Sequence, residues 1–131
     1  MAYAVRADIE LIFGSTNVSK WADLNNDEDA GEITARIVWA LTLAEERVNN
    51  RLRQGKYDIP FATAPTEITD LTARWAGVIL YDSRLVIDGE DSDLSRHEKT
   101  VEDRLSKILA GKIKLSTDVA VATYPQVVLD G

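Results

Sequence analysis

Two apolar stripes at helical spacing, separated by a short segment with glycine and proline, constrain the fold of this chain most. Apolar residues recur at steps of three and four from Ile33 to Leu52, which predicts a long amphipathic helix over about Ala30 to Gln54. Gly55 ends it, and a second helix is predicted from about Pro65 to Leu85. This second helix is apolar on nearly every side, so we expect it to be the buried centre of the fold.

Shorter elements are predicted on both sides of this pair. Residues Val5–Phe13 form a short helix that ends at Gly14, and Ser15–Leu24 reads as either a turn or a short helix. A third main helix is predicted from Ser95 to about Ala110. The tail from Lys112 to Gly131 is rich in β-branched residues and reads as an extended arm or one or two short strands. The predicted fold class is therefore mainly α, a small bundle of about four helices with two long central helices and an extended C-terminal arm.

Length, charge and cysteine content exclude several kinds of protein. A chain of 131 residues fits one domain, predicted to span residues 1–131 with 112–131 as the arm. The net charge of −7 opposes general nucleic-acid binding, which needs clustered Lys and Arg. Cysteine is absent, which excludes disulfides and thiolate chemistry. The longest apolar run, Trp75–Tyr81, is far shorter than the ~20 residues that span a bilayer, so we expect a soluble protein with no membrane partner.

Two acidic segments were compared with the calcium loop of EF-hands, which needs glycine at position 6 and glutamate at position 12. A loop starting at Asp23 places Glu28 and Thr34 at those positions. A loop starting at Asp88 has its glycine at the second position, Gly89. Neither matches, and the sequence predicts solvated acidic loops and no metal site.

The one histidine is the only residue that suggests catalysis. His97 has Glu98 beside it, and a histidine oriented by a carboxylate can act as a general base. Its position in the first turn of a highly charged helix predicts instead a histidine on the solvent face. No phosphate loop, HExxH pair or serine elbow occurs in the chain. We therefore expect no catalytic residues, no cofactor and no enzymatic activity.

The aromatic residues are predicted to have structural roles. Trp21, Trp39 and Trp75 lie on or beside helix stripes and are expected in the core. Tyr57 and Phe61 lie in the segment between the long helices. They either hold the two helices together or are displayed at a subunit contact.

A basic group gathers mainly around the end of the first long helix. Its members are Arg47, Arg51, Arg53, Lys56 and Arg84. Residues of this kind are typical helix-end charges or ion-pair partners. They could also contact phosphate or, more readily at a net charge of −7, another protein.

The order of these segments resembles the small head–tail connector, or head-completion, proteins of Mu-like tailed bacteriophages. The resemblance rests on the opening helix that ends in Phe13-Gly14, and on the end of the long helix followed by Gly55-Lys-Tyr-Asp-Ile-Pro-Phe61. It also covers a proline-started helix with an Arg-Trp-Ala…Leu-Tyr-Asp segment at Arg74–Asp82, and a last helix of the form Val101–Lys112. Each motif has an ordinary folding explanation, and the resemblance lies in their order along the whole chain.

This resemblance implies a structural virion protein that forms a ring, commonly twelve-fold, between the portal and the tail. Such a ring extends the DNA channel and provides a docking surface for the tail. The implied partners are the portal protein, a tail-completion or tail-terminator protein, and further copies of the chain. Packaged DNA would pass nearby without sequence-specific binding. The implied location is the head–tail interface of the virion, and the host cytoplasm during assembly.

A ring of this kind uses two different surfaces on each subunit, so complementary charges would help it close. The basic end of the first long helix and the acidic 88–93 loop are candidates for such a pair, and the valine-rich tail could add a strand to a neighbour. The candidate interface residues are Arg47, Arg51, Arg53, Lys56, Tyr57, Phe61, Asp88, Glu90, Asp91, Asp93, Val119, Val121, Val127 and Val128. The alternative is a small acidic regulatory or inhibitory protein that binds a basic surface on a partner.

Overall fold

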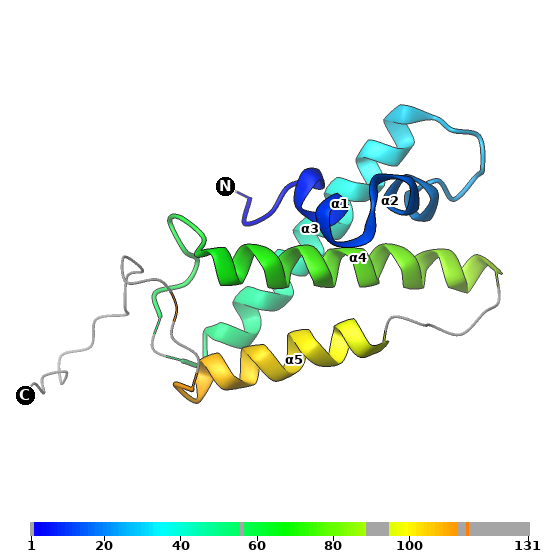
Figure 1. Cartoon of the computed structure of the whole chain (residues 1–131). Helices are drawn as coiled ribbons and strands as arrows, with labels where there is room; N and C mark the ends of the chain where they lie inside the picture. The colour runs from blue at the N-terminus through cyan, green and yellow to red at the C-terminus, as the bar shows by residue number, and fades with distance from the viewer. Residues whose placement is uncertain (1, 56, 89–94, 113–114, 116–131) are drawn as a thin grey trace, which may run out of the picture.

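The computed structural model describes residues 2–55, 57–88, 95–112 and 115, and within these ranges it contains five helices (Figure 1). Their bounds are α1 Arg6–Phe13, α2 Ser15–Ala22, α3 Ala30–Leu52, α4 Thr66–Asp88 and α5 Ser95–Leu109. The mainly helical prediction is confirmed, and Ser15–Leu24 proves to hold a true helix. The predicted strands of the tail lie outside the described residues.

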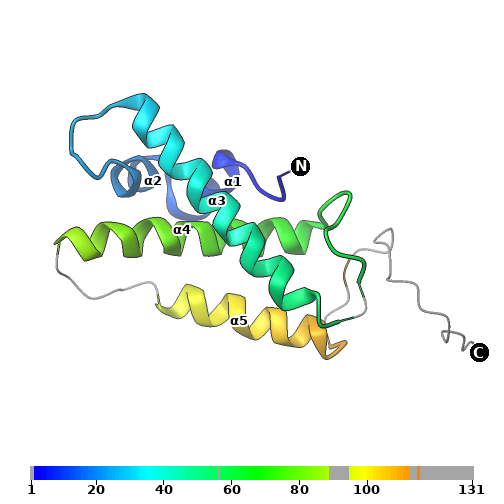
Figure 2. The same ribbon diagram turned by 180° about the vertical axis from the view of Figure 1, so that it is seen from behind.

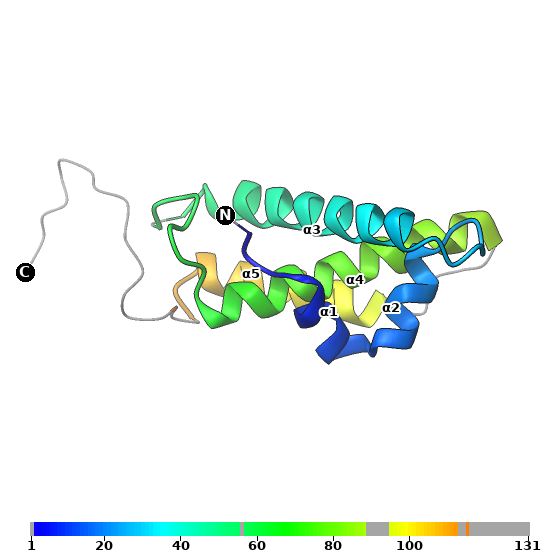
Figure 3. The same ribbon diagram turned by 90° about the horizontal axis from the view of Figure 1, so that it is seen from above.

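Helix α4 is the centre of the fold, as its apolar composition predicts. All four other helices pack against it, and α3 does so most extensively. Seen from behind, α3 crosses α4 obliquely while α5 runs alongside α4 (Figure 2). Seen from above, α3 lies on one side of α4 and α1 on the other (Figure 3).

Local signals explain where the two long helices begin and end. The side chain of Asp29 accepts hydrogen bonds from the backbone N–H groups of Gly31 and Glu32, which caps the first turn of α3. Helix α3 ends at Leu52, two residues before the predicted Gln54, and a turn leads to Gly55. Helix α4 starts immediately after Pro65, whose carbonyl accepts the first helical hydrogen bonds, and it continues to Asp88 beyond the predicted end at Leu85.

Close approach of α1 to α4 depends on a glycine. A Cβ atom added to Gly77 would lie 2.1 Å from Cε2 of Phe13. The Phe13 ring therefore lies directly against the α4 backbone, where it also meets Trp21 at 5.4 Å between ring centroids. Gly14 follows with φ of 91°, a conformation that suits glycine, and lets α2 start at once after α1.

The buried core runs along the inner faces of α3, α4 and α5 and includes Ile9 of α1 and Val18 of α2. Trp75 is buried as predicted. Among the described residues, no helix combines the length and apolar character that a bilayer-spanning segment needs.

Candidate subunit-contact surfaces

The N-terminal segment is held between α3 and α4 by a buried tyrosine. The backbone N–H of Tyr3 donates to Oε1 of Glu45 at 2.7 Å, and its hydroxyl donates to Oδ1 of Asn49 at 2.6 Å. The same hydroxyl accepts from the backbone N–H of Phe61 at 2.8 Å. Thr69 donates to the Tyr3 carbonyl at 2.8 Å. Residues from α3, from the segment after α3 and from α4 therefore fix this end of the chain.

An apolar groove of about 420 Å³ remains between this segment and α3. We call it the N-terminal groove, and its lining residues are Ala2, Ala4, Val5, Arg6, Thr34, Ile37, Val38, Leu41, Thr42 and Glu45. Val5 and Val38 are 54% and 55% exposed, so two large apolar side chains border it in contact with solvent. Apolar surface of this kind, bordered by polar side chains such as Arg6 and Glu45, is typical of a protein-interaction site.

A second surface lies on a different side of α3, next to the C-terminal half of α4, and combines the ring of Trp39 with charged side chains. We call it the Trp39 surface, and its residues are Arg36, Trp39, Leu43, Arg47, Ile79, Asp82 and Ser83. Trp39 is 41% exposed, and the guanidinium of Arg36 lies 4.3 Å from the centroid of its ring. Because successive residues of a helix point about 100° apart, Val38 of the groove and Trp39 of this surface face different directions.

The predicted core position of Trp39 is therefore wrong. The arc of α3 that faces the core is made by Ile37, Ala40 and Ala44, and Trp39 lies on its flank. The small alanines allow close contact with α4, which leaves no space for an indole between the helices. The same flank holds two buried polar atoms without a hydrogen-bond partner among the described residues, Nε of Arg36 and Oδ1 of Asp82. Unsatisfied groups of this kind are rare in folded chains and call for an explanation.

The segment between α3 and α4 holds the two aromatic residues with alternative predicted roles. Phe61 is 6% exposed and packs against Tyr3, with ring centroids 5.7 Å apart. It therefore joins the core and holds the helices together. Tyr57 is half-buried, its ring centroid 6.2 Å from that of Phe61, and its hydroxyl lies 3.5 Å from the backbone N–H of Leu115. The Ile59–Pro60 peptide bond between them is cis.

The three arginines of the predicted interface have partners within the chain. Arg51 pairs with Glu102 and donates to Oγ of Ser106 at 3.0 Å, which ties α3 to α5. Arg53 donates to Asn50 at 2.7 Å. Arg47 lies 5.8 Å from the ring centroid of Trp75 and belongs to the Trp39 surface.

Arg84 has a structural role. It is 9% exposed, and its guanidinium donates to the carbonyls of Lys20 and Asp23 at 3.1 and 2.6 Å and to Oδ1 of Asn26 at 2.8 Å. These acceptors lie at the end of α2 and just beyond it, so Arg84 connects α4 to the loop before α3. The interpretation of this arginine as a helix-end partner is thus correct.

Several predicted interface residues lie where the structure says little or nothing. Asp88 is the last residue of α4. Lys56, Glu90, Asp91, Asp93 and the four tail valines, Val119, Val121, Val127 and Val128, lie outside the described residues. The proposed pairing of the acidic loop with the basic end of α3 stays a prediction.

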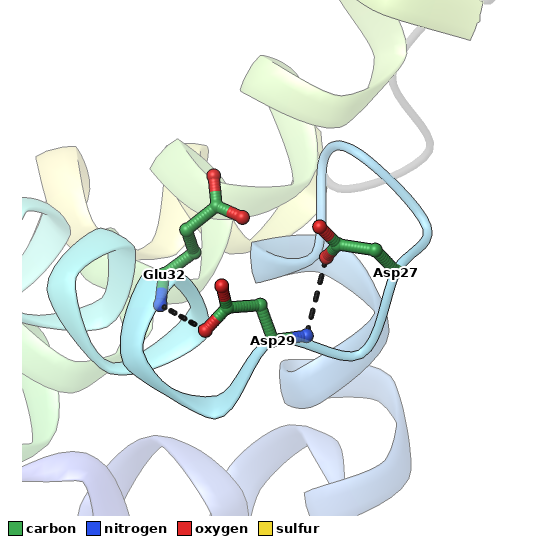
Figure 4. Close-up of side chains that lie close together, drawn as sticks. All are labelled: Asp27, Asp29 and Glu32. Atoms are coloured by element: carbon green, nitrogen blue, oxygen red, sulfur yellow. Dashed lines mark hydrogen bonds between the residues drawn. The ribbon is translucent and has the colours of Figure 1, made fainter.

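Three acidic side chains approach one another at the start of α3 (Figure 4). Asp27, Asp29 and Glu32 each place a carboxylate oxygen within 4.8 Å of the others, and all three are exposed. Backbone hydrogen bonds account for this arrangement, because Asp29 caps α3 and Asp27 accepts from the backbone N–H of Asp29 at 3.2 Å. Helix capping explains the position of Asp29, and the exposure of all three side chains agrees with the prediction of a solvated acidic loop.

The prediction that His97 lies on the solvent face is wrong. The histidine is half-buried, its ring lies edge-on to Phe13 with centroids 5.0 Å apart, and its Nδ1 is 3.3 Å from Nη1 of Arg74. The His97 side chain thus lies between Phe13 of α1 and Arg74 of α4, a position that the charged residues around it in the sequence do not indicate. Burial lowers the pKa of His97, and the positive charges of Arg74 and Arg96 lower it further. Within the described ranges, the polar partner of His97 is the Arg74 cation, and no carboxylate there orients the ring.

Neither the N-terminal groove nor the Trp39 surface was predicted from the sequence. The available signals were Val38 and Trp39, two large apolar residues that lie off the stripe of α3. The groove has a second wall, residues 2–5, which belongs to no helix and gives no periodic pattern.

Comparison with known proteins identifies the family. No individual curated protein matches the chain. The family model described as "Bacteriophage Mu, Gp36" matches residues 3–127, which is nearly the entire sequence. The chain therefore belongs to the bacteriophage Mu Gp36 family and is a phage-related protein.

Proposed function

We propose that this protein is a ring-forming adaptor of the virion, placed between the portal and the tail. The observation that carries the proposal is the presence of two separate candidate contact surfaces, the N-terminal groove and the Trp39 surface, on different sides of α3, in a chain that belongs to a phage protein family. A head-to-tail ring needs two different contact surfaces on each subunit, whereas a two-fold dimer needs one.

Membership of the family makes a particle-associated role the natural context for these surfaces. In this role the ring extends the DNA channel beyond the portal and gives the tail a docking surface. The partners are the portal subunit on one side and a tail-completion or tail-terminator protein on the other. Subunits gather in the host cytoplasm during assembly and end at the head–tail interface of the particle.

The charge of the chain suits a channel component. At a net charge of −7, the protein has no general attraction for DNA phosphates, so DNA could pass the ring without being bound tightly. The basic side chains of Arg51 and Arg84 are engaged within the chain, which further limits what it offers to phosphate.

Fractionation of a lysate tests the proposal. Particles of the source phage are purified by density gradient, and the protein is quantified in the particle fraction and in the free protein fraction. The adaptor role predicts that it remains with particles through repeated washing. Presence only in the free fraction would support the regulatory alternative and refute the adaptor role.

A further inference from the structure

The N-terminal groove and the Trp39 surface of this chain carry complementary charges. The N-terminal groove is concave and apolar, with Glu45 at its edge. The Trp39 surface presents a partly exposed indole with Arg36 stacked on it. From this pairing we infer that a second copy of this chain occupies the N-terminal groove and inserts Trp39, with Arg36 directed toward Glu45 of the first copy.

The size of the groove agrees with an aromatic occupant. Its volume of about 420 Å³ lies in the range of pockets that enclose a small organic group. Trp39 is 41% exposed, so insertion would remove this remaining surface from water, and tryptophan is among the commonest anchors of protein interfaces. Val5, Val38 and Leu41 would supply apolar walls for it.

Charge gives the contact its direction. At the groove, Arg6 is paired with Glu10 at 3.0 Å, so Glu45 supplies the uncompensated charge of the rim. Glu45 accepts one hydrogen bond from Tyr3, and a carboxylate has further acceptor sites. On the other surface, the guanidinium of Arg36 is stacked on the Trp39 ring and supplies a positive charge. Arginine binds carboxylates with favourable geometry, so this charge suits Glu45 of a neighbouring copy.

The contact is of the head-to-tail type. After one groove has received one Trp39, the first copy still offers its Trp39 and the second still offers its groove. Repetition therefore adds copies in one direction and closes into a ring when the rotation per copy permits. The inference thus rests on the proposed ring and deepens it, by naming the surfaces through which the subunits meet.

Cysteine cross-linking tests the inference cleanly because the natural chain contains no cysteine. Val38→Cys places a thiol at the groove, and Ser83→Cys places one at the Trp39 surface. With a short thiol-reactive cross-linker, the double variant is expected to give a ladder of dimers, trimers and higher species. An equal mixture of the two single variants should give dimers only, and each single variant alone should stay monomeric.

The experiment is run on the purified full-length chain at high concentration and on purified particles. Absence of a ladder in both samples would overturn the inference. So would efficient dimers from Val38→Cys alone, which indicate a two-fold groove-to-groove contact. A link from Val38→Cys to Val128→Cys, without the ladder, would show that the C-terminal tail occupies the groove and would also overturn it.

A matched pair of alanine variants provides a second readout. Trp39→Ala is expected to weaken self-association by about 30-fold or more, as expected for the loss of a central interface anchor. Leu11→Ala is the control, because Leu11 is 85% exposed but belongs to neither surface. Self-association of both variants as strong as that of the wild-type chain would overturn the inference.

If the protein is present in particles but the ladder is absent, the inference alone fails. If the protein is missing from particles, the proposed function fails whether or not the purified chain forms the ladder.

Discussion

Removal of the Tyr3 hydroxyl provides a quantitative test of how the N-terminal wall of the groove is held. In Tyr3→Phe the ring can keep its packing on Phe61, but two buried hydrogen bonds are lost, to Asn49 and from the Phe61 backbone. A buried group that loses its partner costs about 1–3 kcal/mol, so we expect a combined loss of roughly 2–4 kcal/mol. For a domain of this length that corresponds to a fall in melting temperature of roughly 6–16 °C.

Thr72→Val is the matched comparison. Thr72 is fully buried in α4, and its hydroxyl has no hydrogen-bond partner among the described residues. Valine has almost the same shape and similar helix propensity, so removing this unpaired hydroxyl should leave stability unchanged or raise it.

Both variants are measured by urea unfolding followed by circular dichroism, with calorimetry as a second probe. The account predicts a clear loss for Tyr3→Phe and none for Thr72→Val. If Tyr3→Phe falls within ~0.5 kcal/mol of wild type, as surface substitutions do, the hydrogen-bond network at Tyr3 does not hold the segment and the reasoning is refuted.

Three further predictions concern contacts around α4. Arg84→Ala should destabilise the chain by about 2–4 kcal/mol because charged hydrogen bonds to the end of α2 are lost. Hydrogen exchange should then show faster opening of α2, and unchanged protection of α2 would contradict this. Gly77→Ala should lower the free energy of unfolding by about 1–3 kcal/mol because the new methyl group meets Phe13. Adding Phe13→Ala to the same chain should relieve part of this loss. A stabilised Gly77→Ala variant would show that the contact is loose. His97 should titrate below its ordinary pKa of about 6.5 in an NMR titration of this single histidine. Since the unfolded chain then binds the proton more readily than the folded chain, stability should fall as pH drops through and below about 6.5. His97→Gln should remove this part of the pH dependence. A pKa at or above about 6.5 would be inconsistent with the structure.

The helices could be predicted from the sequence because their signals are local and periodic. The stripe of α3 and the apolar character of α4 each point to one outcome, and the structure has that outcome. The helical state of Ser15–Ala22 stayed open, since eight residues carry too few turns for a clear period.

The contact surfaces depend on features that no local pattern contains. Trp39 was expected in the core because it borders the stripe, and only the close packing of α3 on α4 decides that it lies outside. His97 was expected at the surface because its neighbours in sequence are charged, yet its neighbours in space are Phe13 and Arg74. The N-terminal groove requires residues 2–5 to lie along α3, a long-range arrangement set by Tyr3.

The most direct test of the central claim is the copy number of this protein in purified particles, measured by quantitative mass spectrometry against the portal subunit. A ring adaptor at the portal vertex predicts a ratio close to one. Absence of the protein from particles, or a ratio far from that of a single ring, would contradict the account.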